Sequence, residues 1–393
     1  MTHRVTRLAA LLCAAAAGAC DQSRTAADVE RWRLEIVQRV EPAADPRSPN
    51  APGRFVGVVR SDDGGLVVAD RAAGALHFYD PVGAPVKSVA GAGDAGSFRD
   101  LIGLQRIRGD SLAVFDALRL VHVLAADGAY GRTLLLFEQD TATHTVFRLH
   151  GFFRDGATLA VGWPQPQGGA LLDSLRLRVY SPAGALDHVL GPFPAVRYAG
   201  RERVVFSPIT SVAIVDDRIV VGYPDSFRVR VFARDGTDVA QLARPWTARA
   251  VTDAERGWYA NAFLNAADDD GAPPSAELRE LRRRALQAVS FAPHLPAYRR
   301  ILAGVDDRIW VEHYHPEHEL PATLSPVPRG PGFWSVFDLE DGWIADVEVP
   351  AGVRILDVVA DHATGVQRDA AGAERPVLLR IARDGAPSTD PAP

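Results

Sequence analysis

The chain has 393 residues, of which 47% are hydrophobic and 23% are charged, and this composition is typical of a globular protein with a large core. The formal net charge is −6, and it becomes −8 (41 basic against 49 acidic residues) once a leader containing Arg4 and Arg7 is removed. An acidic chain lacks the basic surface of a general nucleic-acid binder, so we expect no nucleic-acid partner.

Residues 1–19 have the pattern of a secretory signal peptide. The basic residues Arg4 and Arg7 precede an apolar run over residues 8–17, which is too short to span a membrane as a permanent helix. The small residues before Cys20 resemble a bacterial lipoprotein cleavage site, although Ala17 stands where that pattern usually has leucine. This resemblance implies a lipid on Cys20, with plain secretion as the alternative. Either outcome predicts an exported protein of the cell envelope, with a lipid anchor at Cys20 as its sole membrane contact.

Residues 20–31 are polar and predict a tether, and residues 32–40 alternate apolar and polar side chains, as a half-buried strand does. A pattern of turns and short strands then occurs twice, first over residues 61–89 and again, about 46 residues later, over residues 108–136. A unit of about 40–50 residues that contains four short strands is the signature of a β-propeller blade.

Four later segments repeat this scheme, and together they predict an all-β, six-bladed β-propeller over residues 32–385, followed by a disordered tail at 386–393. The last blade lacks a fourth strand. We expect the N-terminal strand at 32–40 to supply it, because closure of the ring hides the open edges of the first and last sheets.

One segment, residues 247–297, departs from the strand pattern. Thr252 and Glu255 form a capping box that predicts a helix, and Ser275 can cap a second helix after the break at residues 268–274. We therefore expect a helical hairpin inserted between blades four and five.

The chain resembles the bacterial six-bladed β-propellers of the NHL/TolB-like kind, which are secreted or lipid-anchored proteins. The likeness rests on the glycine-rich loop at 91–98, the turn-strand-Asp element at 109–116, and residues 295–298 with 307–311. It implies the fold and leaves the function open, because propellers host enzymes, scaffolds and sensors alike.

Two short motifs have plain structural interpretations. Residues 91–96 match a dinucleotide-binding glycine pattern, but a strand rather than the required helix is expected after them. Residues 109–112 spell the signature of a serine esterase family, but Ser111 lies in a predicted hairpin turn that recurs without serine in other blades. We expect no cofactor, since no haem motif or iron–sulfur spacing is present.

Residues 312–319 hold the densest group of potential metal ligands. His313, His315 and His318 are weak candidates for a zinc or copper site, and a solvated polar loop is the alternative, because Pro316 interrupts the strand.

Alignment of the second strand of each blade places six side chains at the same end of the central channel. They form a ring that either faces a ligand or, in the case of the acids, caps neighbouring loops. The six are Asp70, Asp116, Trp163, Tyr223, His313 and Asp369.

The long insertions at 164–174, 247–297 and 314–332 all fall in loops expected on one face of the disc, and long aromatic loops on a rigid scaffold mark binding surfaces. Trp258, Tyr259, Tyr314 and Phe333 are the further candidates on this insertion face.

These features favour a non-enzymatic propeller of the cell envelope that binds an unknown protein or small-molecule ligand on its insertion face. The alternative is a metal-dependent hydrolase or lyase that resembles the calcium lactonases, with a site in the central channel. Such sites mix Asn with Asp and Glu, whereas Asn50, Asn261 and Asn265 all lie outside the predicted blade strands.

Overall fold

The computed structural model describes most of the chain. The described residues are 29–41, 54–91, 98–107, 111–117, 120–135, 137–140, 145–164, 172–200, 202–266, 273–304, 306–319, 330–370 and 372–383. The predicted signal peptide, Cys20 and the C-terminal tail lie outside these ranges.

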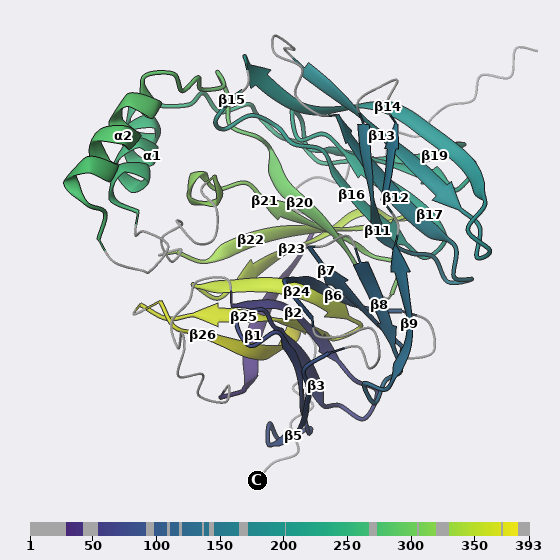
Figure 1. The fold of residues 1–393 in the computed structure, drawn as a ribbon. Coiled ribbons are helices and arrows are strands. Elements are labelled where there is room, and N and C mark those ends of the chain that lie inside the picture. The colour runs from purple at the N-terminus through teal and green to yellow at the C-terminus, as the bar shows by residue number, and fades with distance from the viewer. Residues whose placement is uncertain are drawn as a thin grey trace, which may run out of the picture.

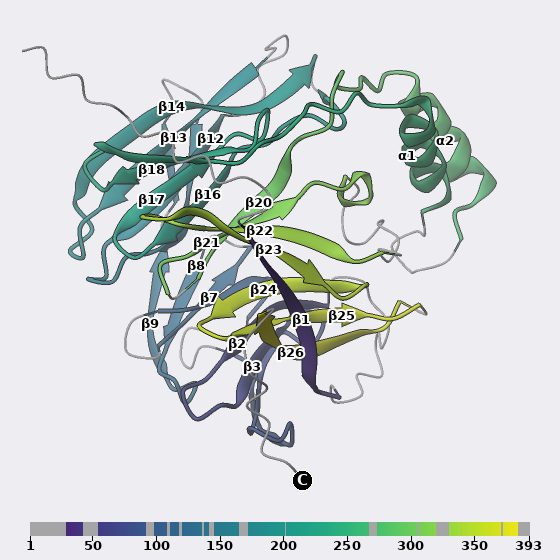
Figure 2. The ribbon, with the colours of Figure 1, turned by 180° about the vertical axis from the view of Figure 1, so that it is seen from behind.

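The described strands form four separate sheets and one eight-stranded sheet, in a propeller-like arrangement (Figures 1 and 2). The first sheet contains β2 (Phe55–Arg60), β3 (Leu66–Asp70), β4 (Ala75–Tyr79) and β5 (Pro85–Val89). The second contains β6 (Leu101–Arg106), β7 (Leu112–Asp116), β8 (Leu120–Leu124) and β9 (Tyr130–Leu135).

The third sheet is larger than the sequence pattern predicts. It contains β10 (Phe137–Asp140), β11 (Thr145–Phe152), β12 (Thr158–Pro164), β13 (Leu172–Tyr180), β14 (Leu186–Ala199) and β15 (Glu202–Arg203). The strand β14 extends to 14 residues because its second half buries Phe193, Ala195 and Val196 in the core of this sheet. The fourth sheet contains β16 (Ser211–Val215), β17 (Arg218–Gly222), β18 (Arg228–Ala233) and β19 (Asp238–Ala243).

The eight-stranded sheet combines the end of the chain with its N-terminal strand. In spatial order it contains β20 (Tyr298–Ala303), β21 (Ile309–His313), β22 (Gly332–Asp338), β23 (Gly342–Val349), β1 (Glu30–Arg39), β26 (Glu374–Arg383), β25 (His362–Arg368) and β24 (Val353–Val359). The predicted pairing of the N-terminal strand with the last strand is confirmed, since β1 runs antiparallel to β26.

The alternation along β1 explains this pairing. Trp32 and Leu34 are buried in the core between neighbouring strands, whereas the residues beside them face outward. Leu34 lies opposite Ile381 of β26, so one face of the strand completes the core and the other faces solvent.

A central channel is surrounded by the inner strand of each sheet unit. These inner strands, called first strands below, are β2, β6, β11, β16, β20 and β24. The strand β2 contacts both β6 and β24, and β20 contacts both β16 and β24. Residues of β6, β11, β16, β20 and β24 line one cavity on this axis. The strands β2, β11, β16 and β24 each run to a tight turn and return as β3, β12, β17 and β25, so these turns gather at one end of the channel.

Aspartate and glycine shape the tight turns between neighbouring strands as predicted. Asp155 accepts a hydrogen bond from the backbone of Ala157 at 2.9 Å, and Gly156 between them adopts φ 89°. Asp127 and Gly128 repeat this geometry, and a Cβ atom at Gly128 would lie 2.8 Å from the Phe78 ring. Glycine is therefore required there both by backbone conformation and by space.

The predicted helical hairpin is present between β19 and β20. Its helices are α1 (Asp253–Asn265), which begins at the predicted Thr252 capping box, and α2 (Ala276–Leu286), capped by Ser275. Neither helix has a buried residue, and both project from one side of the sheets (Figure 1). In the described part of the chain, no helix is long and apolar enough to cross a membrane.

Candidate functional site

The predicted ring acids are engaged with the loops around them. Asp70 is fully buried and accepts hydrogen bonds from Arg54 Nε at 2.7 Å and from the backbone of Ala73 at 3.0 Å. Asp116 is also buried and accepts from the backbone of Arg99 at 2.8 Å. Both carboxylates therefore have the capping arrangement that the sequence left open as one of two interpretations.

Asp369 follows the same principle in a more exposed position. Its carboxylate accepts from the backbone of Ala373 at 3.0 Å and pairs with Arg375 Nη1 at 2.9 Å. The two ring aromatics, Trp163 and Tyr223, are partly buried; Trp163 packs against the core of the third sheet, and burial raises the pKa of Tyr223.

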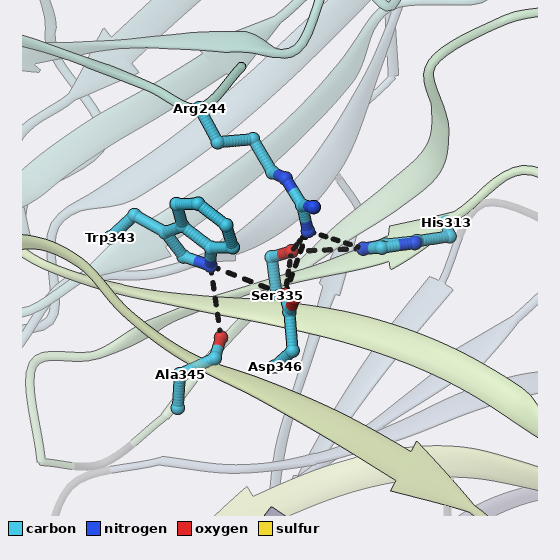
Figure 3. A network of polar contacts seen from close by, with 6 residues as sticks. All are labelled: Arg244, His313, Ser335, Trp343, Ala345 and Asp346. Carbon is cyan, nitrogen blue, oxygen red and sulfur yellow. Dashed lines mark hydrogen bonds and ion pairs between the residues drawn. The ribbon is translucent and has the colours of Figure 1, made fainter. Parts of the chain in front are cut away.

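His313 differs from the other ring residues because it belongs to a polar network between two sheets (Figure 3). Arg244, directly after β19, reaches across to the eight-stranded sheet. Its Nη1 donates to Asp346 Oδ1 at 2.7 Å and to Ser335 Oγ at 2.5 Å, and it lies 3.2 Å from His313 Nε2. Asp346 Oδ1 also accepts from Ser335 Oγ at 2.8 Å and from the indole of Trp343 at 3.2 Å.

The network fixes the guanidinium through one nitrogen only. The Arg244 Cζ atom lies 4.1 Å from the Trp343 ring centroid and 5.1 Å from that of Phe227, so aromatic rings hold the planar group as well. Among the described residues, Nε and Nη2 of Arg244 have no hydrogen-bond partner. Arg244 is thus a positioned cation that retains donors for a further acceptor.

His313 is held neutral by this environment. Burial and the adjacent charge of Arg244 lower the pKa of His313 to about 4. Nε2 of the neutral ring contacts both Ser335 Oγ at 2.8 Å and Arg244 Nη1 at 3.2 Å.

A cavity of about 250 Å³ adjoins Arg244 and His313 at the base of the helical insertion. Trp246, Leu295 and Pro296 supply apolar wall, and Arg249 and Tyr314 supply polar groups. The described lining contains two arginines and no carboxylate, although Arg249 pairs with Glu255 at 2.6 Å outside it. This combination of an oriented cation and an apolar wall suits an anion with an apolar body.

The other predicted insertion-face residues surround this cavity or lie beyond it. Tyr314 donates to Glu319 Oε2 at 2.6 Å, and burial raises its pKa. Tyr259 of α1 packs edge-on against Phe206 and Phe291, and so attaches the helix to the sheets. Trp258 is partly buried on the same helix, whereas Phe333 is 50% exposed and lines a different cavity beside Asp346.

The histidine-rich segment turns sharply after His313. His315 is exposed, and its Nδ1 accepts from the backbone of Glu317 at 3.3 Å at the start of the short helix η3 (Pro316–His318). Within the described residues, no three His, Cys, Asp or Glu side chains are grouped closely enough to hold a metal ion. The side chain of His318 lies outside the described part.

The sequence analysis did not identify Arg244, Ser335 or Asp346 as members of this site. Ser335 and Asp346 lie opposite each other inside β22 and β23, whereas Arg244 follows β19 and is 69 to 102 residues distant along the chain from the residues it contacts. A sequence signal does exist for Arg244: an arginine between a blade's last strand and the insertion, followed at once by Pro245 and Trp246.

No family model and no curated protein matches the chain. Its fold is similar to that of a member of the DUF4221 family from Bacteroides vulgatus, with 10% identity, a TM-score of 0.51, and coverage of 91% of this chain and 100% of that one. A weaker likeness is to regucalcin, a calcium-binding protein from Agrobacterium tumefaciens, with 10% identity, a TM-score of 0.41, and coverage of 90% of this chain and 96% of that one. Another is to virginiamycin B lyase from Staphylococcus aureus, with 8% identity, a TM-score of 0.38, and coverage of 88% of this chain and 99% of that one. At these identities the likeness shows the propeller fold alone.

Proposed function

We propose that this chain is a six-bladed β-propeller of the cell envelope that binds an anionic ligand in the Arg244 cavity of its insertion face. The ligand presents a carboxylate or similar anion to Nε and Nη2 of Arg244. Its apolar body packs against Trp246 and Pro296. The protein acts by binding, and the helical hairpin borders the site.

The six-blade count rests on how the eight-stranded sheet divides. The strands β22 and β23 pair antiparallel, as do β1 and β26. Between them, β1 and β23 pair in parallel over only four residues. This junction separates β20–β23 from β24–β26 with β1, and each half has the four strands of one blade.

The binding proposal is carried by one observation, the orientation of the Arg244 guanidinium. A free arginine side chain must lose rotamer freedom when it binds an anion, whereas this one is already fixed by Asp346, Ser335 and two aromatic rings. Burial lowers the pKa of Arg244, yet no base in the network is strong enough to remove its proton.

The envelope location rests on the leader sequence. A small-residue run before Cys20 supports cleavage and lipidation at this cysteine. Mass spectrometry of the protein expressed in a bacterium with its leader tests this directly, since a lipidated mature N-terminus is expected for the natural sequence and not for Cys20→Ser.

Binding is tested by isothermal titration calorimetry of the mature protein with phenylacetate, which carries one carboxylate and one apolar ring. We expect a dissociation constant of about 1 mM for a ligand of this size. Arg244→Gln should weaken binding by about 10-fold or more, because a charge-assisted hydrogen bond is lost. The matched control is Arg230→Gln, an exposed arginine on β18 that pairs with Asp238. Equal binding by both variants would overturn the proposal.

A further inference from the structure

The central channel contains a second cavity, unrelated to the Arg244 site. It has a volume of about 210 Å³, and its walls are the first strands of several sheets. Most of its lining is apolar or backbone. The polar side chains in it are Gln105 of β6, His150 of β11 and Asp357 of β24.

These polar groups lack protein partners for most of their hydrogen-bonding capacity. His150 Nε2 donates to the carbonyl of Val212 at 2.9 Å, and because burial lowers the pKa of His150, the neutral ring keeps an unused acceptor at Nδ1. Within the described ranges, the hydrogen-bond partner of the Asp357 carboxylate is the backbone of its neighbour Val358. No described residue hydrogen-bonds the Gln105 amide, which lies over Gly151, where a Cβ atom would be 3.3 Å from its Oε1.

Acceptors on a channel wall that have no described protein partner are available to a donor that enters the channel. A polar group removed from bulk water costs free energy unless it finds a partner, and a channel open to solvent lets a partner enter. His150 shows that the channel is open to solvent. Protein atoms surround this residue on most sides, but the part of its side chain that faces the channel is accessible.

The channel widens into a cavity of about 730 Å³ at the end where the first-to-second strand turns meet. Gln105 and Asp357 line both cavities, so the two form one continuous space. The described lining of the wide part holds six aspartates and two arginines.

The arginines at this mouth do not balance the acids. Arg154 lies between Asp216 at 2.7 Å and Asp307 at 3.4 Å, and Arg106 pairs with Asp62 at 2.8 Å. Arg234, outside the lining, is shared between Asp155 and Asp217. Five turn carboxylates thus share three guanidinium groups, and Asp357 adds a further acid deeper in the channel. The resulting negative field attracts cations toward the channel.

We infer that the channel binds a small organic cation, a primary ammonium compound with an apolar chain, whose charged head lies between Asp357, His150 and Gln105. The ammonium group donates three hydrogen bonds, which matches the acceptors of these three side chains. The chain packs against Ile214, Leu302 and Leu356 of the same cavity. A metal ion fits less well, since the described residues here do not supply three grouped His, Cys, Asp or Glu ligands.

The test is calorimetric titration with n-butylammonium chloride, compared with 1-butanol and with calcium chloride. We expect butylammonium to bind and butanol to bind at least 10-fold more weakly. We expect Asp357→Asn, which keeps the side-chain shape, to weaken butylammonium binding at least 10-fold. Asp238→Asn, which removes an exposed acid of β19 far from the channel, is the matched control and should bind as the unchanged protein does.

A second variant, Gln105→Ala, removes a different acceptor of the ammonium group and should weaken butylammonium binding several-fold. Absence of binding to the unchanged protein, equal binding of butanol, or displacement of butylammonium by equimolar calcium would each overturn the inference. Arg244→Gln should leave butylammonium binding unchanged, so failure here and failure of the proposed anion site are distinguishable.

Discussion

Nη1 of Arg244 lies 3.2 Å from Nε2 of His313, and this contact joins the fourth sheet to the eight-stranded sheet. The arginine comes from the end of β19 and the histidine from the end of β21. The same nitrogen also binds Asp346 on β23. Thus the positioned cation of the proposed site depends on side chains from both sheets.

We expect stability to fall as the pH is lowered from about 6.5 to about 4. The pKa of His313 is about 4 in the folded state and near 6.5 when unfolded, so the unfolded state takes up the proton first across this window. The stabilisation is fully present above the unfolded value and amounts to on the order of 3 kcal/mol. Urea unfolding at several pH values measures it.

His313→Gln should remove most of this pH dependence, because glutamine does not titrate. The control is His315→Gln, an exposed histidine whose loss should leave the profile unchanged. A profile for His313→Gln that matches the unchanged protein would contradict the assignment. Direct observation of the His313 ring by NMR gives the pKa itself.

Arg244→Gln should lower the free energy of unfolding by about 2 kcal/mol, because Asp346 loses its cationic partner and two aromatic rings lose a cation. Arg230→Gln should cost about 0.5 kcal/mol, as expected for an exposed ion pair. Chemical unfolding followed by tryptophan fluorescence compares the two. Equal losses would show that Arg244 has no special structural role.

Asp357 should act in the opposite sense to His313. Burial raises the pKa of Asp357 to about 6, while Arg106 partly offsets this, so the folded state holds the proton more tightly than the unfolded state. Its stabilising effect is present below about pH 4 and is lost as the pH rises through about 6. The Asp357→Asn variant should therefore be more stable than the unchanged protein at neutral pH, by on the order of 3 kcal/mol.

The measurement for Asp357 is the difference in unfolding free energy between the two proteins at about pH 4 and pH 7.5. The other titratable groups that line the channel and its mouth, which include Arg106, His150 and the turn aspartates, are present in both proteins, so their contributions cancel in this difference. A difference that does not grow with pH would contradict the raised pKa.

Much of the fold could be predicted because its rules are local. The turn-and-strand repeat predicts the sheets, and Thr252 with Glu255 predicts the start of α1. The role of β1 follows from the need to cover an open sheet edge. The length of β14 and the short strands β10 and β15 could not be predicted, since they depend on packing between sheets and on edges that periodicity does not specify.

The candidate site was harder to predict, because aligning the strands shows where a side chain lies on its blade but not which other side chain it contacts. It places Asp70 and His313 at equivalent strand ends, yet it cannot show that Arg54 reaches Asp70 while Arg244 reaches His313. The channel residues carried a clearer signal. Gln105, His150 and Asp357 each directly follow a leucine in the second half of a blade's first strand.

The N-terminal strand β1 provides a test of whether its pairing with the last strand contributes to the core. Leu34 of β1 is 4% exposed, and Leu34→Ala should cost about 2–4 kcal/mol, as for other buried leucines. Val37→Ala, at a position 48% exposed on the same strand, should cost about 0.5 kcal/mol or less. Comparable losses in urea unfolding would mean that β1 does not contribute to the core.

The anion site itself is tested most directly by NMR titration of isotope-labelled protein with phenylacetate. The indole N–H signals of Trp246 and Trp343 report on the cavity and on the ring beneath Arg244, and each is assigned by its Trp→Phe variant. We predict that these two signals shift most and that Arg244→Gln abolishes the shifts. Unchanged indole signals at saturating phenylacetate, or shifts that persist in Arg244→Gln, would contradict the proposed site.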